Sequence, residues 1–190
     1  MRRELVMSGI GGQGIQLAAQ VLARGALRDG LHVQLFGSYG GMMRGGNTDA
    51  TLVVSDAPVA APPTVDMAWS GFVMHHDYSE ATFARLGADS LVVVDSTVFE
   101  GDLPPHLEKV TMVPATGIAI DIGRKQTAAM VMVGAYLGVT DLMSVESVLA
   151  AVPQSLPAYR EKFVDLNQRA ITAGFQAGRE LATETTVAAK

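Results

Sequence analysis

The chain has 190 residues, enough for one ordinary domain with a sizeable core. Apolar residues make up 48% of it and charged residues only 17%, where about 25% charged is usual. Either another protein covers part of the surface, or the composition reflects an alanine- and glycine-rich proteome. The net charge of −5 with scattered basic residues argues against a nucleic-acid partner. The absence of cysteine excludes disulfides, cysteine nucleophiles and cysteine-ligated iron–sulfur clusters in this chain.

The first part of the sequence predicts strands joined by glycine-rich turns. A strand over 5–7 precedes Gly9-Ile10-Gly11-Gly12-Gln13-Gly14, which opens an amphipathic helix that ends before Gly30. The next strands cover 32–36 and 49–55, with a second glycine-rich loop between them. Because no helix fits into that second gap, the strand over 49–55 is expected to be antiparallel to its neighbours.

Later segments alternate strands with helices and then become helical. Strands are predicted over 67–72, 90–95 and 110–113, and the apolar run at 90–95 is typical of a central strand buried on both faces. Helices are predicted over 79–86, 116–122, 126–137, 145–152 and 157–181, with Ser144 as an N-cap and Pro153 as a helix end. The helix over 126–137 is apolar all round and should be buried. The pattern favours a single α/β domain over 1–181 and a disordered tail over 182–190.

The location of the protein is expected to be cytoplasmic, without a membrane partner. The first residues show no apolar signal-peptide region. The longest apolar run, over 128–139, is shorter than the ~20 residues that span a bilayer.

The first glycine loop is a candidate phosphate cradle. Gly9, Gly11 and Gly14 follow a strand and open a helix, which is the context of the dinucleotide fingerprint. A self-contained NAD(P)-binding oxidoreductase also needs an acid at the end of the second strand, and that position has none. Gly12 and Gln13 depart further from the pattern. A tight turn that serves only helix–sheet packing is the other interpretation, and a non-enzymatic assembly module is a further alternative.

The second glycine loop, over 37–47, holds five glycines around Arg44. Glycine permits the close approach of a ligand or of another backbone. The Arg44 guanidinium would clamp a carboxylate or phosphate, or form a salt bridge across a subunit interface. Both interpretations stay open.

Three other polar groups invite a functional interpretation. Adjacent His75 and His76 would point to opposite faces of a strand or diverge by roughly 100° in a helix, so no metal site is expected there. Asp77 is expected to cap the following helix. Asp95-Ser96-Thr97 ends a strand at the carboxyl edge, where ligands bind in open α/β sheets, although a plain turn explains it equally well.

The two glycine motifs together resemble the gamma subunit of 2-oxoacid:ferredoxin (acceptor) oxidoreductases of the pyruvate, 2-oxoglutarate and indolepyruvate type. Gly-x-Gly-Gly-Gln-Gly begins a helix, and Ser-Tyr-Gly-x-x-x-Arg-Gly-Gly precedes a strand that ends Val-Ser-Asp. The resemblance runs on through Pro114-Ala-Thr, Met130-Val-Met-Val-Gly-Ala and Leu166-Asn167, and covers roughly 5–178. Two positions depart from it: Met42 stands where the family usually has glutamate, and Ala129 where it often has asparagine.

The resemblance implies a Rossmann-like three-layer sandwich with a mostly parallel sheet, an antiparallel strand and a helical C-terminal part. It implies a complex that oxidatively decarboxylates a 2-oxoacid to an acyl-CoA or acid, with thiamine diphosphate, Mg²⁺, [4Fe–4S] clusters and, where acyl-CoA forms, CoA. Electrons pass to ferredoxin or another acceptor. The partners are alpha and beta subunits and, in some complexes, a ferredoxin-like delta subunit.

Within such a complex the chain would serve assembly and shape the CoA side of the active centre. By itself it is expected to hold no cofactor, no metal and no catalytic residue, and to be inactive. The expected ligand, CoA or interface residues are Gly9, Gly11, Gly12, Gln13, Gly14, Ser38, Tyr39, Arg44, Gly45, Gly46 and Asn47.

Overall fold

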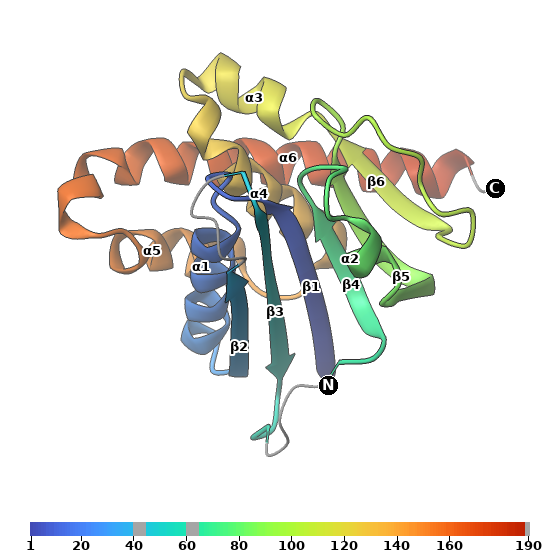
Figure 1. Ribbon diagram of the computed structural model, residues 1–190. Coiled ribbons are helices and arrows are strands. Elements are labelled where there is room, and N and C mark those ends of the chain that lie inside the picture. Colours follow the sequence, from blue (N-terminus) through green and yellow to red (C-terminus); the bar gives the residue numbers. More distant parts are fainter. Residues whose placement is uncertain (40–44, 60–64, 189–190) are drawn as a thin grey trace.

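The computed structural model describes the backbone of residues 1–39, 45–59 and 65–188, and the side chains of all of these except 38, 39 and 184–188 (Figure 1). The strands are β1 (Arg2–Ile10), β2 (His32–Tyr39), β3 (Asn47–Ser55), β4 (Ala68–Val73), β5 (Leu86–Asp95) and β6 (Lys109–Val113). The α-helices are α1 (Ile15–Arg28), α2 (Glu80–Phe83), α3 (Ala115–Ile122), α4 (Ala128–Thr140), α5 (Val145–Ser155) and α6 (Val164–Ala188). Two 3₁₀ turns, η1 (Lys125–Thr127) and η2 (Ala158–Phe163), precede α4 and α6.

The strands form one sheet in the order β2-β3-β1-β4-β5-β6. The pairs β1–β4, β4–β5 and β5–β6 are parallel, whereas β3 runs antiparallel to both β1 and β2. The expected mostly parallel sheet with one antiparallel strand is confirmed. The strand β3 lies between β1 and β2, so the first strand–helix–strand unit joins two strands that are not neighbours.

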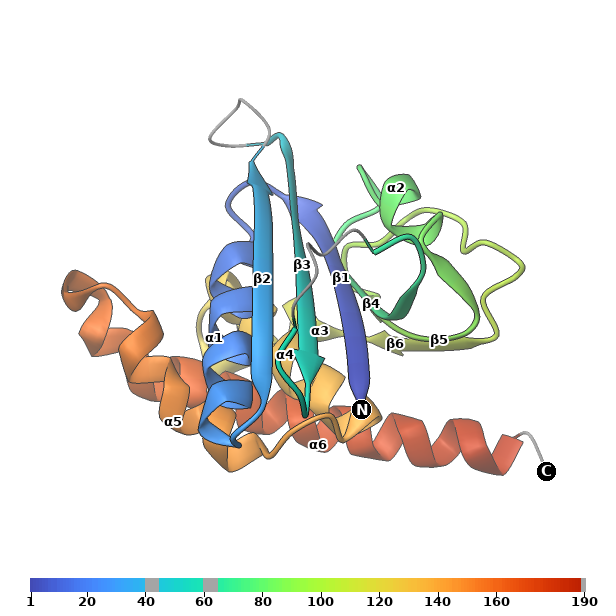
Figure 2. The same ribbon diagram turned by 90° about the horizontal axis from the view of Figure 1, so that it is seen from below.

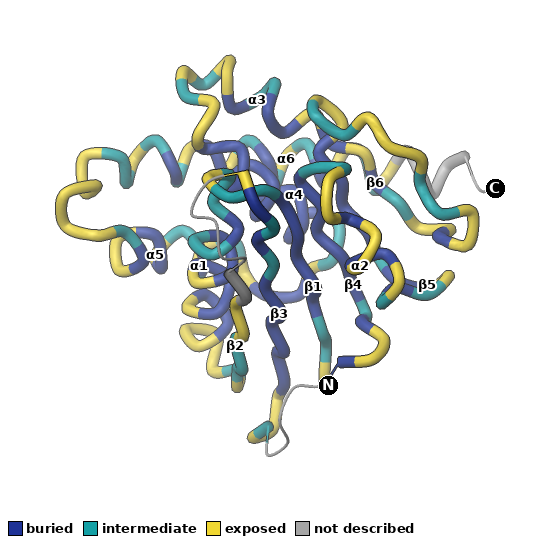
Figure 3. Tube along the Cα trace, in the orientation of Figure 1, coloured by how far each residue is buried: buried dark blue, intermediate teal, exposed yellow. Residues whose placement is uncertain are grey.

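The two faces of the sheet are covered unequally (Figure 2). Helices α1, α4, α5 and α6 form a thick layer over one face, where Leu5, Met7 and Leu52 meet the helical side chains. The other face carries a smaller cluster around Val6, Val53 and Val92, under the one-turn helix α2 and its adjoining loops. The expected three-layer sandwich is therefore confirmed, with one thin layer. In Figure 3, most residues of β1, β3 and β4 are buried, whereas exposed residues lie in the connecting loops and on the outer side of the helices.

The centre of the helical layer is a close crossing of α4 and α6. A Cβ atom on Gly134 would lie 1.9 Å from the carbonyl oxygen of Ile171, and one on Gly174 would lie 1.9 Å from that of Val131. Gly138 and Gly178 meet the opposite backbone in the same way, one turn further along. Only glycine lets the two helices approach so closely. All residues of α4 from 128 to 138 are buried, as the all-apolar pattern predicts.

The end predicted for α5 at Pro153 is wrong, because the helix continues to Ser155 with the proline inside its last turn. Proline has no N–H to donate to the carbonyl of Leu149 four residues earlier. The Nε2 of Gln168, from α6, donates to that carbonyl instead, at 3.0 Å. A side chain from a neighbouring helix therefore satisfies the acceptor that the proline leaves open.

Three other element predictions need correction. The helix predicted over 79–86 shrinks to α2, because the chain already enters β5 at Leu86. The segment predicted as one helix from 157 begins as the turn η2 and becomes α-helical at Val164, and its helical backbone extends to Ala188 rather than 181. The strand β5 is second from the edge rather than central, although its residues 92–95 are fully buried. No helix in the described ranges is both long and apolar enough to cross a bilayer.

Candidate functional site

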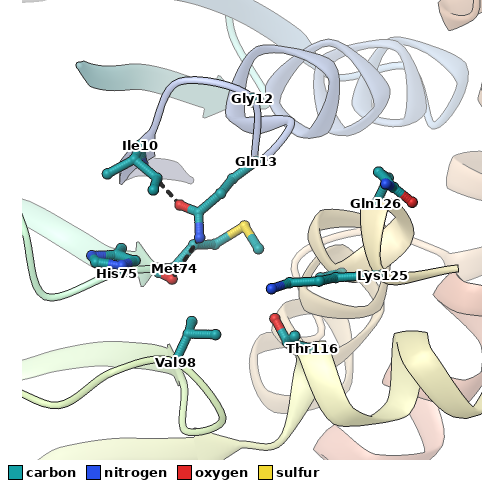
Figure 4. A pocket seen from close by; sticks show the side chains of 10 residues that line it. Ile10, Gly12, Gln13, Met74, His75, Val98, Thr116, Lys125 and Gln126 are labelled. Atoms are coloured by element: carbon teal, nitrogen blue, oxygen red, sulfur yellow. Dashed lines mark hydrogen bonds between the residues drawn. The ribbon is translucent and has the colours of Figure 1, made fainter. Parts of the chain in front are cut away.

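A cavity of about 290 Å³ opens at the carboxyl edge of the sheet, beyond the ends of the neighbouring parallel strands β1 and β4 (Figure 4). The chain leaves β1 through α1 toward β2, while β4 and β5 lie on the other side of β1. This reversal of strand order is the place where open α/β sheets bind ligands. The cavity is lined by Ile10, Gly12, Gln13, Met74, His75, Val98, Thr116, Lys125, Gln126 and Ala128.

Gln13 holds the first glycine loop in place (Figure 4). Its side-chain oxygen accepts the backbone N–H of Ile10 at 2.8 Å, and its amide nitrogen donates to the carbonyl of Met74 at 3.2 Å. A Cβ on Gly9 would lie 2.6 Å from that side-chain oxygen. The glutamine that departs from the dinucleotide pattern therefore ties the end of β1 to the end of β4, and Gly9 makes room for it.

The N-terminus of α1 borders this region. Gly12 and Gly14 have φ values of +102° and +93°, in the region that only glycine enters readily. Gly14 is the N-cap of α1, which has no side-chain cap and no acidic residue in its first turn. The dipole of the helix therefore favours an anion near this end.

The two glycine loops meet in the structure. The N–H of Gly11 donates to the carbonyl of Gly46 at 2.8 Å, and the N–H of Gly45 donates to that of Gly11 at 3.4 Å. Asn47, at the start of β3, donates to the carboxylate of Asp49 at 3.2 Å. Burial raises the pKa of the Asp49 carboxyl, and the positive charge of Arg85 offsets only part of that rise in pKa. The sequence analysis treats the two loops separately and does not predict this contact.

The structure does not describe the side chains of three of the expected site residues. Ser38 and Tyr39 are the last backbone positions of β2, and their side chains are not described. Arg44 lies outside the described residues, as does Met42.

Cations that the sequence does not single out surround the first glycine loop. Lys125, from η1, lines the 290 Å³ cavity. A second cavity of about 170 Å³ shares Gly12 and Gln126 with the first and is also lined by Gly14, Arg124 and Arg160. The Arg124 guanidinium stacks 3.8 Å from the ring of Phe163. Lys125, Arg124 and Arg160 form no ion pair with any described residue. No sequence motif marks these three residues, because Arg160 is distant from the other two in the sequence and lies near them only in the folded chain.

Buried Asp95 holds Thr116, one of the residues that line the cavity, in place. Its carboxylate accepts the hydroxyl of Thr116 at 2.6 Å and the backbone N–H groups of Thr116 and Thr97 at 3.2 and 3.1 Å. These bonds join the end of β5 to the start of α3. Asp95 lies at the carboxyl edge as the sequence indicates, and its observed contacts are structural.

The loop after β4 departs from two expectations. His75 and His76 belong to neither a strand nor a helix, and their rings lie 4.3 Å apart at a tilt of 31° instead of diverging. The Asp77 carboxylate lies 3.7 Å from Nδ1 of His75 and 3.6 Å from Nε2 of His76. The geometric argument against convergence is therefore wrong. Asp77 is also not the cap of α2, because Ser79 occupies the N-cap position.

The two cavities combine positively charged side chains with an apolar lining. The charged groups are the Lys125 ammonium and, in the second cavity, the guanidinium groups of Arg124 and Arg160. The apolar lining of the larger cavity includes Ile10, Met74 and Val98. A preorganised arrangement of this kind binds and orients a ligand.

Comparison with known proteins places this architecture in a family. The family model for pyruvate ferredoxin/flavodoxin oxidoreductases matches residues 4–177. The 2-oxoglutarate synthase subunit KorC of Methanothermobacter marburgensis is 34% identical over 97% of this chain and 98% of its own length. The gamma subunit of a keto/oxoacid ferredoxin oxidoreductase from Geobacter sulfurreducens PCA has a TM-score of 0.82 at 30% identity, over 95% of this chain and 98% of its own.

A longer protein contains the same fold. The 2-oxoglutarate:ferredoxin oxidoreductase of Magnetococcus marinus, solved with 2-oxoglutarate, coenzyme A and succinyl-CoA bound, gives a TM-score of 0.83. The match covers 95% of this chain and 31% of that chain at 18% identity, so the likeness concerns the fold alone. The comparisons do not favour a self-contained NAD(P) enzyme. The chain belongs to the pyruvate ferredoxin/flavodoxin oxidoreductase family and is the gamma subunit of a multi-subunit 2-oxoacid:ferredoxin oxidoreductase.

Proposed function

We propose that this subunit forms the CoA side of the active centre, with the first glycine loop and its surrounding cations binding CoA phosphates. The observation that carries the proposal is the uncapped N-terminus of α1, flanked by one cavity that contains Lys125 and another that contains Arg124 and Arg160. Phosphates favour such helix N-termini, and guanidinium groups pair with them bidentately. When bound, CoA would supply the thiol that accepts the acyl group.

The position of Gly12 supports one elongated ligand. Gly12 lines both cavities, and a Cβ there would meet nothing within 4 Å. A ligand with several phosphates would therefore reach cations in both cavities. The apolar floor of the larger cavity suits its uncharged portion.

The other cofactors belong to partner chains in this proposal. The chain has no cysteine, so [4Fe–4S] clusters must be held elsewhere. We propose alpha and beta subunits that carry thiamine diphosphate and Mg²⁺, with a ferredoxin-like delta subunit in complexes that have one. Their reaction is the oxidative decarboxylation of a 2-oxoacid, with electrons passing to ferredoxin or another acceptor. The purified gamma subunit alone is expected to show no oxoacid oxidation.

The test uses the complex reconstituted with its companion subunits. Lys125→Ala, Arg124→Ala and Arg160→Ala are each expected to raise the KM for CoA about tenfold or more, because each removes a charged partner of a phosphate. The matched control is Arg28→Ala, at the opposite end of α1. Turnover at saturating CoA should change little. If all three variants keep the KM of the parent complex, the CoA assignment is wrong, while normal assembly would still support the subunit role.

Arg44 provides a separate test of the second glycine loop. Arg44→Ala is expected to raise the KM for CoA or to weaken assembly, measured by steady-state kinetics and by size-exclusion chromatography of the complex. If it alters neither, the loop only connects β2 to β3. The other residues expected at the site from the sequence are proposed to shape this region through backbone contacts. They are Gly9, Gly11, Gly12, Gln13, Gly14, Ser38, Tyr39, Gly45, Gly46 and Asn47.

A further inference from the structure

The loop between β4 and α2 brings three metal-ligating side chains together. His75, His76 and Asp77 are consecutive, and one ligand atom from each lies within 4.8 Å of the others. Tyr78 follows with a φ of +63°, a left-handed conformation that is uncommon for a bulky residue. This turn helps to keep the three side chains on one side of the loop.

From this geometry we propose that His75, His76 and Asp77 bind a divalent transition-metal ion of the Zn²⁺ or Co²⁺ type. Imidazole nitrogen with carboxylate oxygen is a donor set that these ions accept, and bonds of about 2.0–2.1 Å in a tetrahedral site place ligands roughly 3.3 Å apart. The carboxylate of Asp77 already lies 3.7 and 3.6 Å from one nitrogen of each ring. Small side-chain rotations close the remaining difference.

The side chains are free enough to make those rotations. The side chains of His75, His76 and Asp77 are 18%, 33% and 60% exposed. The ring of His76 lies edge-on to that of Phe99, with centroids 6.3 Å apart, at the margin of the smaller apolar cluster. An ion from solvent can therefore reach the group without opening the core.

The hydrogen bonds that the two histidine rings already make limit the affinity for the metal ion. The Nδ1 of His75 accepts the N–H of Asp77 at 3.1 Å, and the Nδ1 of His76 accepts the N–H of Glu100 at 3.3 Å. In neutral rings this leaves the proton on Nε2, so coordination must displace these bonds or exchange the ring tautomer. Both bonds are exposed and are readily replaced by water. We therefore expect micromolar rather than nanomolar affinity.

The location gives the ion a role beyond holding the loop. His75 lines the 290 Å³ cavity, and His76 lines a neighbouring cavity of about 500 Å³ that also contains Phe83 and Phe99. Three protein ligands leave at least one coordination position for water or an anionic ligand. The bound ion would add positive charge at the rim of the carboxyl-edge site.

The experiment titrates the purified, metal-free full-length chain, without a polyhistidine tag, with Zn²⁺ by calorimetry and with Co²⁺ by visible absorption. One ion per chain with micromolar affinity is expected, and His75→Ala, His76→Ala or Asp77→Asn should weaken it at least tenfold. His32→Ala and His106→Ala are the matched controls and should bind as the parent does. Circular dichroism confirms that each variant is folded.

A milder variant and a spectroscopic readout guard against misfolding. His76→Gln keeps a polar side chain of similar size and should still lose the Co²⁺ absorption. In the parent protein, Zn²⁺ should shift the imidazole NMR signals of His75 and His76 but not those of His106. Absence of binding in the micromolar range, or equal loss in the control variants, would overturn the proposal.

Discussion

Two regions of this subunit require glycine for different physical reasons. In the loop before α1, a side chain on Gly12 would meet nothing within 4 Å, and the requirement is a φ of +102°. At the crossing of α4 and α6, a side chain on Gly174 would overlap the backbone of Val131. The first region needs backbone freedom beside open space, and the second needs the absence of a side chain.

This difference separates the proposed ligand-binding region, the loop before α1, from the region that stabilises the fold, the crossing of α4 and α6. The loop lines two cavities that contain positively charged side chains, so changes there should affect ligands more than stability. The helix crossing is closed on all sides, so changes there should affect stability first. Two glycines spaced four residues apart on each of two helices are a packing feature, whereas the loop glycines are a feature of the site.

Gly174→Ala should produce the largest effect. Helix propensity alone predicts a gain of about 0.5–1 kcal/mol from this exchange. The overlap with the carbonyl of Val131 instead predicts a loss of about 3 kcal/mol or more, because neither backbone can move away cheaply. Urea unfolding of the isolated chain measures the sign directly. The control is Gln176→Ala on the exposed side of α6, expected within about 0.5 kcal/mol of the parent; a stabilised Gly174→Ala would show that the helices are not in contact.

Gly12→Ala should lower the free energy of unfolding less than Gly174→Ala does, and should weaken CoA binding more. The left-handed backbone imposes a strain of about 1–2 kcal/mol on alanine, with no steric clash to add. Urea unfolding measures that loss, and the KM for CoA of the reconstituted complex should rise at the same time. A stability loss as large as that of Gly174→Ala would contradict the distinction between the two regions.

Tyr136→Phe tests a polar contact inside the closed region. The Tyr136 hydroxyl lies 2.9 Å from Ser70 Oγ, and burial raises its pKa. Its removal should destabilise the fold by about 1 kcal/mol, because Ser70 keeps its bond to the carbonyl of Glu4 at 3.2 Å. Chemical denaturation measures this loss. Gln176→Ala serves again as the surface comparison. If Tyr136→Phe destabilised the fold more than Gly174→Ala does, the hydroxyl would matter more than the helix contact.

Asp29→Asn should give the smallest effect, and one that depends on pH. Burial alone would raise the pKa of Asp29, but hydrogen bonds from Ser147 and Ser144 outweigh it and hold the pKa below its ordinary value. A lowered pKa in the folded state stabilises the protein above the unfolded value of about 3.9, and this contribution is lost as the pH falls through the folded value.

The stability difference between parent and Asp29→Asn should therefore be about 0.5–1 kcal/mol at pH 7, typical of a helix cap, and should disappear in acid. Thermal unfolding at several pH values measures it. A difference that persists in acid would show that the contact does not depend on the charge.

Most of the fold follows from local patterns. The alternation of apolar runs and turns predicts all strands in the described ranges, and the short gap between the second and third predicts that β3 is antiparallel. Pro153 shows where local patterns fail, because the donor that replaces its missing N–H comes from Gln168 on another helix. The stacked rings of His75 and His76 show the same limit, since strand and helix geometry do not describe a loop.

By itself, the sequence determined the α/β class, the two glycine loops and the family resemblance, because these depend on residue type and spacing along the chain. Only the tertiary structure decided that Gly11 pairs with Gly46, that Gln13 joins β1 to β4, and that Arg124, Lys125 and Arg160 surround the start of α1. Those contacts link residues far apart in the chain. Their distances depend on how the helical layer packs on the sheet, and no local periodicity encodes that packing.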